Sequence, residues 1–478
     1  MTFLKRIAFT AGAVAVFATG ATAQDLAQSV LDQYQKDFEA SGLTVTPGNV
    51  TTAGKSVEWT DVKITSKDGL SYTVDFLRAV EIGGDKVQLY YPKVYEISAD
   101  ARDGAPAMEI TIRTDGVEHI VSGPEDGRTH AMKAAKVDLD VKSADGSVDV
   151  KVGLSNLDSN TTRSGSDIPN YVGTINVAAM TMLQNVDDGV SKVKADITYN
   201  DLALAVDVDA IDQEKIEELL NGARNMTITY AAGSGSGNMD IENDDFKGIV
   251  DFTYGSANAV VAVVDGIATL TSQGNDAVYK LKLKELPLPP FEASMDSVGM
   301  TFSAPLKKTD EGVPAAIKMS IGGLKASDTI WGMVDPAGTI PRDKANLNID
   351  LTAKMKWLVD LVKAGEASAP PVQVDSVDIN DITLEVGGAA LNGKGSAILD
   401  NSTMPPMPIG ELNLDLKGGL GLVDKLVGIG LLPAEQAQMA KMMSGMFTVP
   451  GGDGPDHLTS KIEMKEGGAI LANGQRIQ

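Results

Sequence analysis

The sequence predicts a mainly β protein: an elongated, curved antiparallel sheet, or several such sheets, built from hairpins and meanders with a few short packing helices. Two observations predict this fold class. Apolar and polar residues alternate along many short runs, and turns containing Gly, Asp or Asn separate the runs. Strands of this kind present one apolar and one polar face. No run recurs at a fixed period, which disfavours a propeller or a solenoid.

The clearest of these runs forms a predicted hairpin over residues 137–154. Val137, Leu139 and Val141 alternate with charged residues, and residues 144–146 read Ala-Asp-Gly, a turn signal. The alternation resumes after the turn, so one face of the hairpin is apolar and the other faces water. Roughly twenty runs of this type follow one another along the chain.

The first 23 residues have the features of a secretory signal peptide. Lys5 and Arg6 precede an apolar centre over residues 7–20, and Ala-Thr-Ala at 21–23 is a small-residue cleavage site. The apolar part is too short to span a bilayer. We therefore expect cleavage after residue 23 and a periplasmic location. The alternative is an N-terminal membrane anchor, which the regular cleavage site disfavours.

The composition narrows the classes of function. The formal charge is −24, and loss of the two basic residues of the signal peptide leaves 39 basic against 65 acidic residues, or −26. Such a charge repels nucleic acid, so we expect no nucleic-acid partner. The chain has no cysteine, which excludes disulfides, thiol catalysis and cysteine-ligated zinc. No later stretch is long and apolar enough to predict a transmembrane segment in the mature chain.

Helical spacing interrupts the strand pattern at a few places. Residues 25–42 predict an amphipathic helix, a short helix is expected to end at Gly222, and two helices are expected near the C-terminus, the second starting at Pro433. One side of this second helix carries four methionines, namely Met439, Met442, Met443 and Met446. They indicate either a soft apolar surface that contacts a ligand or a helix packed on the sheet.

A Pro-rich stretch near residue 287 divides the mature chain into two parts. We expect an N-terminal lobe over residues 24–286, with one helix and many strands. Residues 287–478 are then a C-terminal β-rich lobe with packing helices. The two lobes are either separate domains or parts of one long sheet.

No set of residues indicates catalysis, and we expect a protein that is not an enzyme. There is no Gly-x-Ser-x-Gly motif, and paired carboxylates are too common in so acidic a chain to nominate a pair. Catalytic, cofactor-binding and metal residues are therefore all predicted as none. Two metal alternatives stay open: calcium at the acidic stretch 240–245, and a site joining His119 and His130 to Glu125 and Asp126.

The stretch from Ser327 to Leu351 predicts a structural joint rather than a catalytic loop. Ser327 is expected to cap a short helix over residues 328–334, because serine is a favoured cap. We expect Trp331 to anchor this helix on the sheet, and Arg342 to pair with an aspartate across the joint. No nucleophile or base accompanies these residues. The remaining residues predicted to form the joint are Asp335, Pro336, Pro341 and Asp343.

The segment TIWGMVDPAGTIPRDKANLNIDL, at residues 329–351, resembles an exported bacterial family catalogued as domain of unknown function 2125. The later order LNGKGSAIL, PIGELNLDLKGGLGLVDKLVGIGLLP and GGAILANGQ is similar to the same family and, more distantly, to AsmA-like envelope proteins. This resemblance covers mainly residues 320–478. The AsmA-like part implies a long curved sheet with an apolar concave face, associated with lipid handling in the envelope. The family offers no catalytic residues to transfer, and this chain lacks the membrane anchor that AsmA-like proteins usually carry.

These observations lead to one expectation and one main alternative. We expect a non-enzymatic periplasmic β-scaffold that binds a lipid or other apolar ligand on a concave sheet face and needs no cofactor. The alternative is an acidic exported structural or interaction protein, calcium-binding and without a ligand groove. The expected partners are lipid or another envelope protein. A third reading, a hydrolase, lacks a recognisable site.

Overall fold

The fold is described by a computed structural model covering residues 26–40, 43–66, 70–101, 106–165, 170–209, 216–359, 371–452 and 454–478. The chain divides into two compact units. The first unit comprises Met1–Ala210 and Ile228–Asp251, and the second comprises Ile211–Thr227 and Phe252–Gln478. Each unit is considered by itself below.

Antiparallel strands and one helix, α2 (Leu26–Ala40), build the first unit. Its strands are β1 (Leu43–Thr46), β2 (Asn49–Ala53), β3 (Ser56–Ser66), β4 (Leu70–Glu81), β5 (Lys86–Tyr90), β6 (Val94–Ala99), β7 (Met108–Asp115), β8 (Glu118–Ser122), β9 (Thr129–Ser143), β10 (Val148–Ser164), β11 (Asn170–Asp187), β12 (Lys192–Asp209) and β14 (Ser234–Glu242). Strands β13 (Met226–Ala232) and β15 (Lys247–Tyr254) each cross a boundary between the units.

The long strands of the first unit pair in chain order from β9 to β12, and β12 then pairs with β14. Between β4 and β9 the ladder is doubled: β5 and β8 bridge one half of the gap, and β6 and β7 bridge the other. The predicted hairpin is confirmed, because Leu139 pairs with Val152 and Val141 with Val150.

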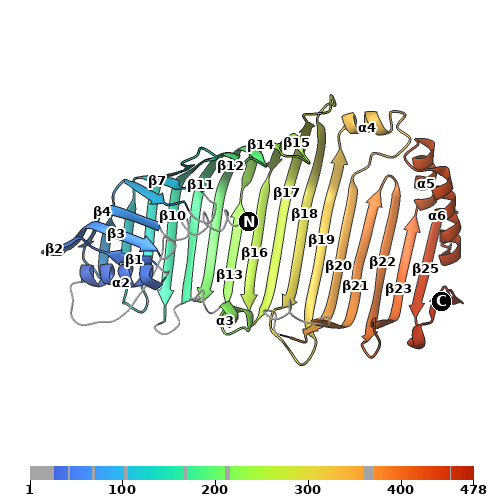
Figure 1. The fold of residues 1–478 in the computed structure, drawn as a ribbon. Helices are drawn as coiled ribbons and strands as arrows, with labels where there is room; N and C mark the ends of the chain where they lie inside the picture. The colour runs from blue at the N-terminus through green and yellow to red at the C-terminus, as the bar shows by residue number, and fades with distance from the viewer. Residues whose placement is uncertain are drawn as a thin grey trace. The chain divides into compact units, whose positions relative to one another are not determined.

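Helix α2 lies against β1, β3 and β4 and forms a core with them (Figure 1). Its Leu31 is fully buried and belongs to the same core cluster as Trp59 of β3 and Leu89 of β5. The spacing of Val30, Leu31 and Tyr34 places these side chains on one face of the helix. This confirms the amphipathic helix predicted over residues 25–42, with its ends at Leu26 and Ala40.

A meander of antiparallel strands builds the second unit, and Figure 1 shows its strands β16 to β23 in chain order. The strands are β16 (Ser256–Val264), β17 (Ile267–Leu283), β18 (Phe291–Pro305), β19 (Val313–Ala326), β20 (Ala345–Trp357), β21 (Val372–Val386), β22 (Ala389–Asp400), β23 (Met407–Lys417), β24 (Val449–Pro450), β25 (His457–Met464), β26 (Ile470–Ala472) and β27 (Gln475–Arg476). Strand β25 pairs with β23 and extends the sheet.

The helices of the second unit occupy connections between strands. They are α3 (Ile216–Leu220), α4 (Asp328–Val334), α5 (Gly419–Gly428), α6 (Ala434–Phe447) and the short 3-10 helix η3 (Glu466–Gly468). Pro433 is the N-cap of α6, as the sequence predicts for the second C-terminal helix. Two carboxylate bonds hold the start of α5, because the Asp456 side chain accepts the N–H groups of Leu420 and Gly421 at 2.9 and 2.8 Å.

A recurrent break divides some strands at a glycine. At Gly48 in the first unit, an added Cβ would lie 2.9 Å from the Cβ of Asp61, which adopts a φ of 53°. Gly255 faces Asp276 (φ 53°) in the second unit in the same way. Only glycine leaves room for the aspartate at these crossings. Each such crossing divides one run into two strands, which accounts for part of the difference between the 27 strands of the described residues and the roughly twenty expected.

The structure confirms the mainly β, antiparallel fold class with a few short helices. The predicted signal peptide lies outside the described residues. The predicted lobe boundary at residues 286 and 287 falls in the connection between β17 and β18, inside the second unit. Within the described ranges, no helix combines the length and the hydropathy needed to cross a bilayer.

Candidate functional site

One face of the second unit's sheet is apolar from strand to strand. Residues that pair directly in an antiparallel ladder point to the same face, so the register defines rows across the sheet. One such row, named here row A, is Val261, Leu270, Phe302, Ile317, Leu351, Ile379, Gly395, Leu412, Ile462 and Ala472. Every side chain in it is a hydrocarbon, and Gly395 adds none.

Two further rows lie on the same face, with row C next to row A and row B beyond row C. Row B is Ala257, Gly274, Val298, Ile321, Leu347, Leu384, Leu391, Leu416 and Leu458, and row C is Ala259, Ser272, Met300, Met319, Ile349, Ile382, Gly393, Leu414 and Ser460. Ser272 and Ser460 carry the only side-chain polar groups of the three rows apart from the two thioethers. Together the rows form the apolar face.

The opposite face of the same sheet is polar. Lys318 and Asp350 pair across β19 and β20 with 2.8 Å between Nζ and Oδ2, and Lys461 pairs with Glu411 at 2.9 Å across β25 and β23. The hydrogen bond from Lys318 holds the pKa of Asp350 below its ordinary value. The alternation read from the sequence therefore separates hydrocarbon from charge over the whole unit.

Much of the apolar face is open to solvent. Phe302 is 39% exposed, Ile317 51% and Met300 45%. Both clusters of buried hydrophobic residues found in the described part of the chain lie in the first unit. With strands about 4.8 Å apart and alternate residues about 6.8 Å apart, the rows cover on the order of 500 Å². Surfaces of this size on soluble proteins commonly mark a binding site.

Helices α5 and α6 cover the C-terminal end of the apolar face. A Cβ added to Gly419, at the start of α5, would lie 2.6 Å from a methyl carbon of Leu416 in row B. At the end of α6, the hydroxyl of Ser460 in row C donates to the carbonyl of Phe447 at 2.6 Å. Both contacts involve residues of the apolar face, so the helical pair lies on that side of the sheet.

The four predicted methionines lie on the face of α6 that points away from α5. Ala437 is buried, and Lys441, one turn later, bonds to Asp424 of α5. At 100° per residue the methionines lie on the other side of the helix. Met439 is 58% exposed and Met442 is 65% exposed, and the remaining two, Met443 and Met446, are similarly open. Contact with an apolar ligand stays a prediction for them.

The predicted joint connects β19 to β20 through α4. The buried Asp335 carboxylate accepts the N–H groups of Ile340 and Thr339 at 2.8 and 3.0 Å, and these bonds hold its pKa below the ordinary value. Arg342 donates to the Asp335 carbonyl at 2.9 Å, and its guanidinium lies 5.6 Å from the centre of the Trp331 ring.

The other predicted features of the joint are placed as follows. Arg342 also lies 3.6 Å from Asp328, an exposed carboxylate at the start of α4. Ser327 is the N-cap residue, but its side chain makes no capping hydrogen bond, which corrects the expectation from the sequence. Pro341 packs beside Gly388, where an added Cβ would lie 3.0 Å from the proline ring. Pro336 and Asp343 are exposed.

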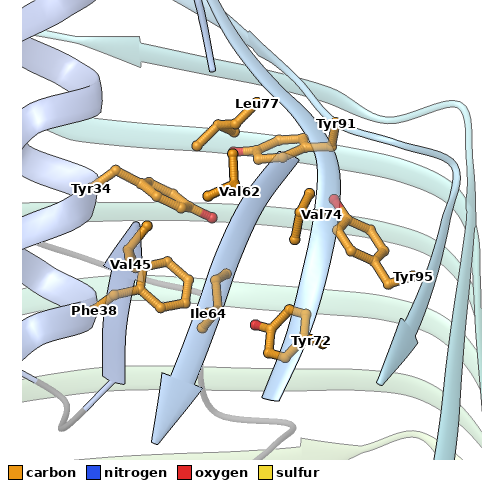
Figure 2. Close-up of a pocket in the computed structure, with 10 residues that line it drawn as sticks. All are labelled: Tyr34, Phe38, Val45, Val62, Ile64, Tyr72, Val74, Leu77, Tyr91 and Tyr95. Carbon is orange, nitrogen blue, oxygen red and sulfur yellow. The ribbon is translucent and has the colours of Figure 1, made fainter. Parts of the chain in front are cut away.

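A small cavity lies under α2 in the first unit (Figure 2). Its volume is about 70 Å³, and its walls are Tyr34, Phe38, Val45, Val62, Ile64, Tyr72, Val74, Leu77, Tyr91 and Tyr95. Figure 2 shows the hydroxyls of Tyr34 and Tyr91 directed toward each other. Burial raises the pKa of Tyr72 to about 12 and raises those of Tyr91 and Tyr95 further. The cavity is therefore apolar with neutral phenols.

Two histidines meet next to this cavity. The Tyr91 hydroxyl lies 2.6 Å from Nδ1 of His119, and Nε2 of His119 lies 3.2 Å from Nδ1 of His130. The sequence singled out these histidines as a metal alternative with Glu125 and Asp126. In the described part of the chain, no group of three or more His, Asp or Glu side chains is arranged to hold a metal ion, at 240–245 or elsewhere.

Comparison with known proteins finds a family match that covers most of the second unit. Residues 252–473 match the family described as "Uncharacterized protein conserved in bacteria (DUF2125)". The resemblance seen over residues 320–478 to this domain of unknown function is thus confirmed, and the match begins earlier, at the first residue of the second unit's main segment. A search of curated proteins finds no match.

Proposed function

We propose that this protein is a non-enzymatic scaffold of the periplasm that binds a lipid, or another ligand with alkyl chains, on the apolar face of its second unit. The observation that carries the proposal is the exposure of rows A, B and C. Burying apolar surface releases about 25 cal/mol per Å², so an alkyl chain laid on this face gains free energy from contact with it.

The chemistry of the face favours alkyl chains over polar ligands. A sugar or nucleotide needs several hydrogen-bonding groups placed around it. The three rows offer only two hydroxyls, and that of Ser460 already donates to Phe447. The distant AsmA-like resemblance, with its implied role in envelope lipid handling, points in the same direction. Export through the predicted signal peptide belongs to the same proposal.

The proposal is tested by mass spectrometry of organic extracts from the mature protein, purified without detergent from its own periplasm. We expect reproducible lipid near one molecule per chain. A double variant, Phe302→Glu with Ile317→Glu, places two carboxylates in the middle of row A. It is expected to lose the lipid, because burying a charge against alkyl chains is costly.

A matched control is Thr301→Glu with Ala316→Glu. Thr301 and Ala316 are the sequence neighbours of Phe302 and Ile317 on the same two strands. Their side chains lie on the polar face, where Thr301 pairs with Lys318 and Ala316 with Ser303. The control adds the same charge and is expected to keep the lipid. Absence of lipid from the natural protein, or equal lipid in both double variants, would contradict the proposal and favour an acidic interaction protein, to be pursued by pull-down.

A further inference from the structure

A chain of four ring side chains connects α2 to β8 and β9 in the first unit. Tyr34 of α2 hydrogen-bonds Tyr91, and Tyr91 contacts His119 of β8 at 2.6 Å. His119 contacts His130 of β9 at 3.2 Å. Nε2 of His130 is buried and has no hydrogen-bond partner among the described residues. The chain therefore ends inside the protein, where water cannot stabilise an added proton.

The segment that carries His130 also fastens α2. Arg128, two residues earlier and 2% exposed, donates to the Ser29 hydroxyl at 2.8 Å and to the Ser29 carbonyl at 3.3 Å. It also donates to the side-chain oxygen of Gln33. His130 and the Arg128 attachment of α2 thus lie two residues apart at the start of β9, so the histidine chain and the attachment of α2 share one segment.

The charged groups around the histidines disfavour a positive charge there. Arg128 lies two residues before His130 and so on the same face of the sheet. Arg163 of β10, also 2% exposed, lies on this face too, because Thr161 pairs with His130 and Arg163 is two residues further along β10. Tyr34, Tyr91 and Tyr95 are neutral. No ion pair joins the histidines to Glu125 or Asp126 of the β8–β9 turn in the described part of the chain.

Two other charged residues lie close in sequence but on the far face. Glu118 and Lys133 pair with each other in the β8–β9 ladder, next to the pair of His119 and Met132, so they alternate to the opposite side. They therefore supply no compensating carboxylate beside the imidazoles. Protonation would add charge to a face that already buries two guanidinium groups.

Burial, together with the neighbouring cations, sets the protonation state. Burial and His130 lower the pKa of His119 to about 3, and burial and Arg128 lower that of His130 to about 4, from an ordinary value near 6.5. Both imidazoles are neutral at pH 7. Their contribution to stability is complete above pH 6.5, and it is lost as the pH falls from 6.5 toward 4 and then 3, because the released form binds protons first.

We propose that the Tyr34–Tyr91–His119–His130 chain is an acid-sensitive latch, which holds α2 on the sheet at neutral pH and releases it on acidification. Release lets water reach the imidazoles. It also uncovers the cavity of Figure 2 and the side chains of Trp59 and Leu89 beneath the helix. The latch is independent of ligand binding in the second unit, and either can fail without the other.

The test is hydrogen exchange followed by mass spectrometry on the mature protein between pH 7 and pH 4, with each rate corrected for its intrinsic pH dependence. Residues 26–40 report on α2, and residues 148–164 report on a strand of the same unit. We expect α2 to lose protection at a higher pH than the strand does. Loss of protection in both together would be global unfolding and would overturn the latch.

The variants separate the latch from general acid sensitivity. His119→Gln with His130→Gln removes both titrating groups and is expected to lower the midpoint of α2 release by roughly one pH unit or more. His457→Gln, in the second unit, is the control and leaves the midpoint unchanged. Should the double variant not fold, His130→Gln alone is expected to lower the midpoint by a smaller amount. An unchanged midpoint in the folded histidine variant would refute the proposal.

Discussion

In the first unit, Val57, Trp59 and Leu89 lie beneath α2 and are at most 2% exposed, whereas Phe302 and Ile317 lie on a sheet face of the second unit and are 39% and 51% exposed. Both sets belong to strands that alternate apolar and polar residues. The units differ in which elements cover the apolar face of these strands. In the first unit α2 covers strands β1, β3, β4 and β5, and in the second α5 and α6 cover the C-terminal end of the apolar face.

An alternating sequence therefore predicts which face of a strand is apolar, but not whether another element of the protein covers that face. A side chain such as Trp59 contributes to folding because the chain itself removes it from water. A side chain such as Phe302, which is 39% exposed, still has apolar surface that contact with another molecule would remove from water. The proposed function assigns binding to the open apolar face of the second unit, whereas the side chains buried under α2 stabilise the first unit.

The largest expected effect is the loss of the tryptophan under α2. Trp59→Ala is expected to lower the free energy of unfolding of the first unit by about 3–5 kcal/mol, because it leaves a cavity in a closed core. Trp357→Ala is the matched control in the second unit, where the indole is only partly buried and donates to the Pro305 carbonyl at 2.7 Å. Its expected cost is roughly 1–2 kcal/mol.

Urea denaturation, followed by circular dichroism and by hydrogen exchange in each unit, measures both costs. Equal losses for the two tryptophan variants would show that the contrast between a closed and an open unit is wrong. A larger loss for Trp59→Ala than for Trp357→Ala would support this contrast. It would mean that most of the folding free energy gained from apolar burial belongs to the first unit.

A smaller effect is expected at the joint between β19 and β20. Arg342→Ala removes the bond to the Asp335 carbonyl and the stacking over Trp331, and it should cost about 1–2 kcal/mol in the second unit. Asp328→Asn removes only a pair at 3.6 Å to a carboxylate that is 94% exposed, and should cost less than about 0.5 kcal/mol. Thermal melts of the two variants check the order, and a reversal would mean that the exposed ion pair holds the joint.

The smallest effect is expected on the open face itself. Phe302→Ala is expected to lower the unfolding free energy by less than about 1 kcal/mol, since the ring is already exposed to water. A loss as large as that of Trp59→Ala would mean that the face is covered in the native protein. Comparison of the variant with and without extracted lipid then tells whether lipid is the cover.

The local sequence pattern of this protein predicts its helices and strands well, but it does not predict which of them lie next to one another in the fold. The alternation around Val137, Leu139 and Val141 predicts a strand, and its register with the next strand follows from a short turn. The helix at 26–40 follows from its apolar spacing. These features depend on residues close in sequence, so a single chain reveals them.

The relations that make the candidate sites depend on distant pairing. Tyr91 and His119 are 28 residues apart, and their contact arises only because β5 pairs with β8. The four tyrosines of the cavity come from α2, β4, β6 and the segment before β6. For the apolar face, the sequence shows the alternation itself, but the continuity of rows A to C requires the register of ten strands. No signal in the sequence states whether another element covers them.

The rows also explain how such a surface could change size in evolution. Each strand from β16 to β23 contributes one residue to each row, and some consecutive strands, such as β16 with β17 and β21 with β22, are joined by two residues. Adding one hairpin lengthens the surface by about 10 Å and leaves the residues of the neighbouring strands in place. For the proposed alkyl ligand, the number of hairpins sets the length of surface on offer, and duplication or deletion of a hairpin would change that length while the remaining strands keep their residues.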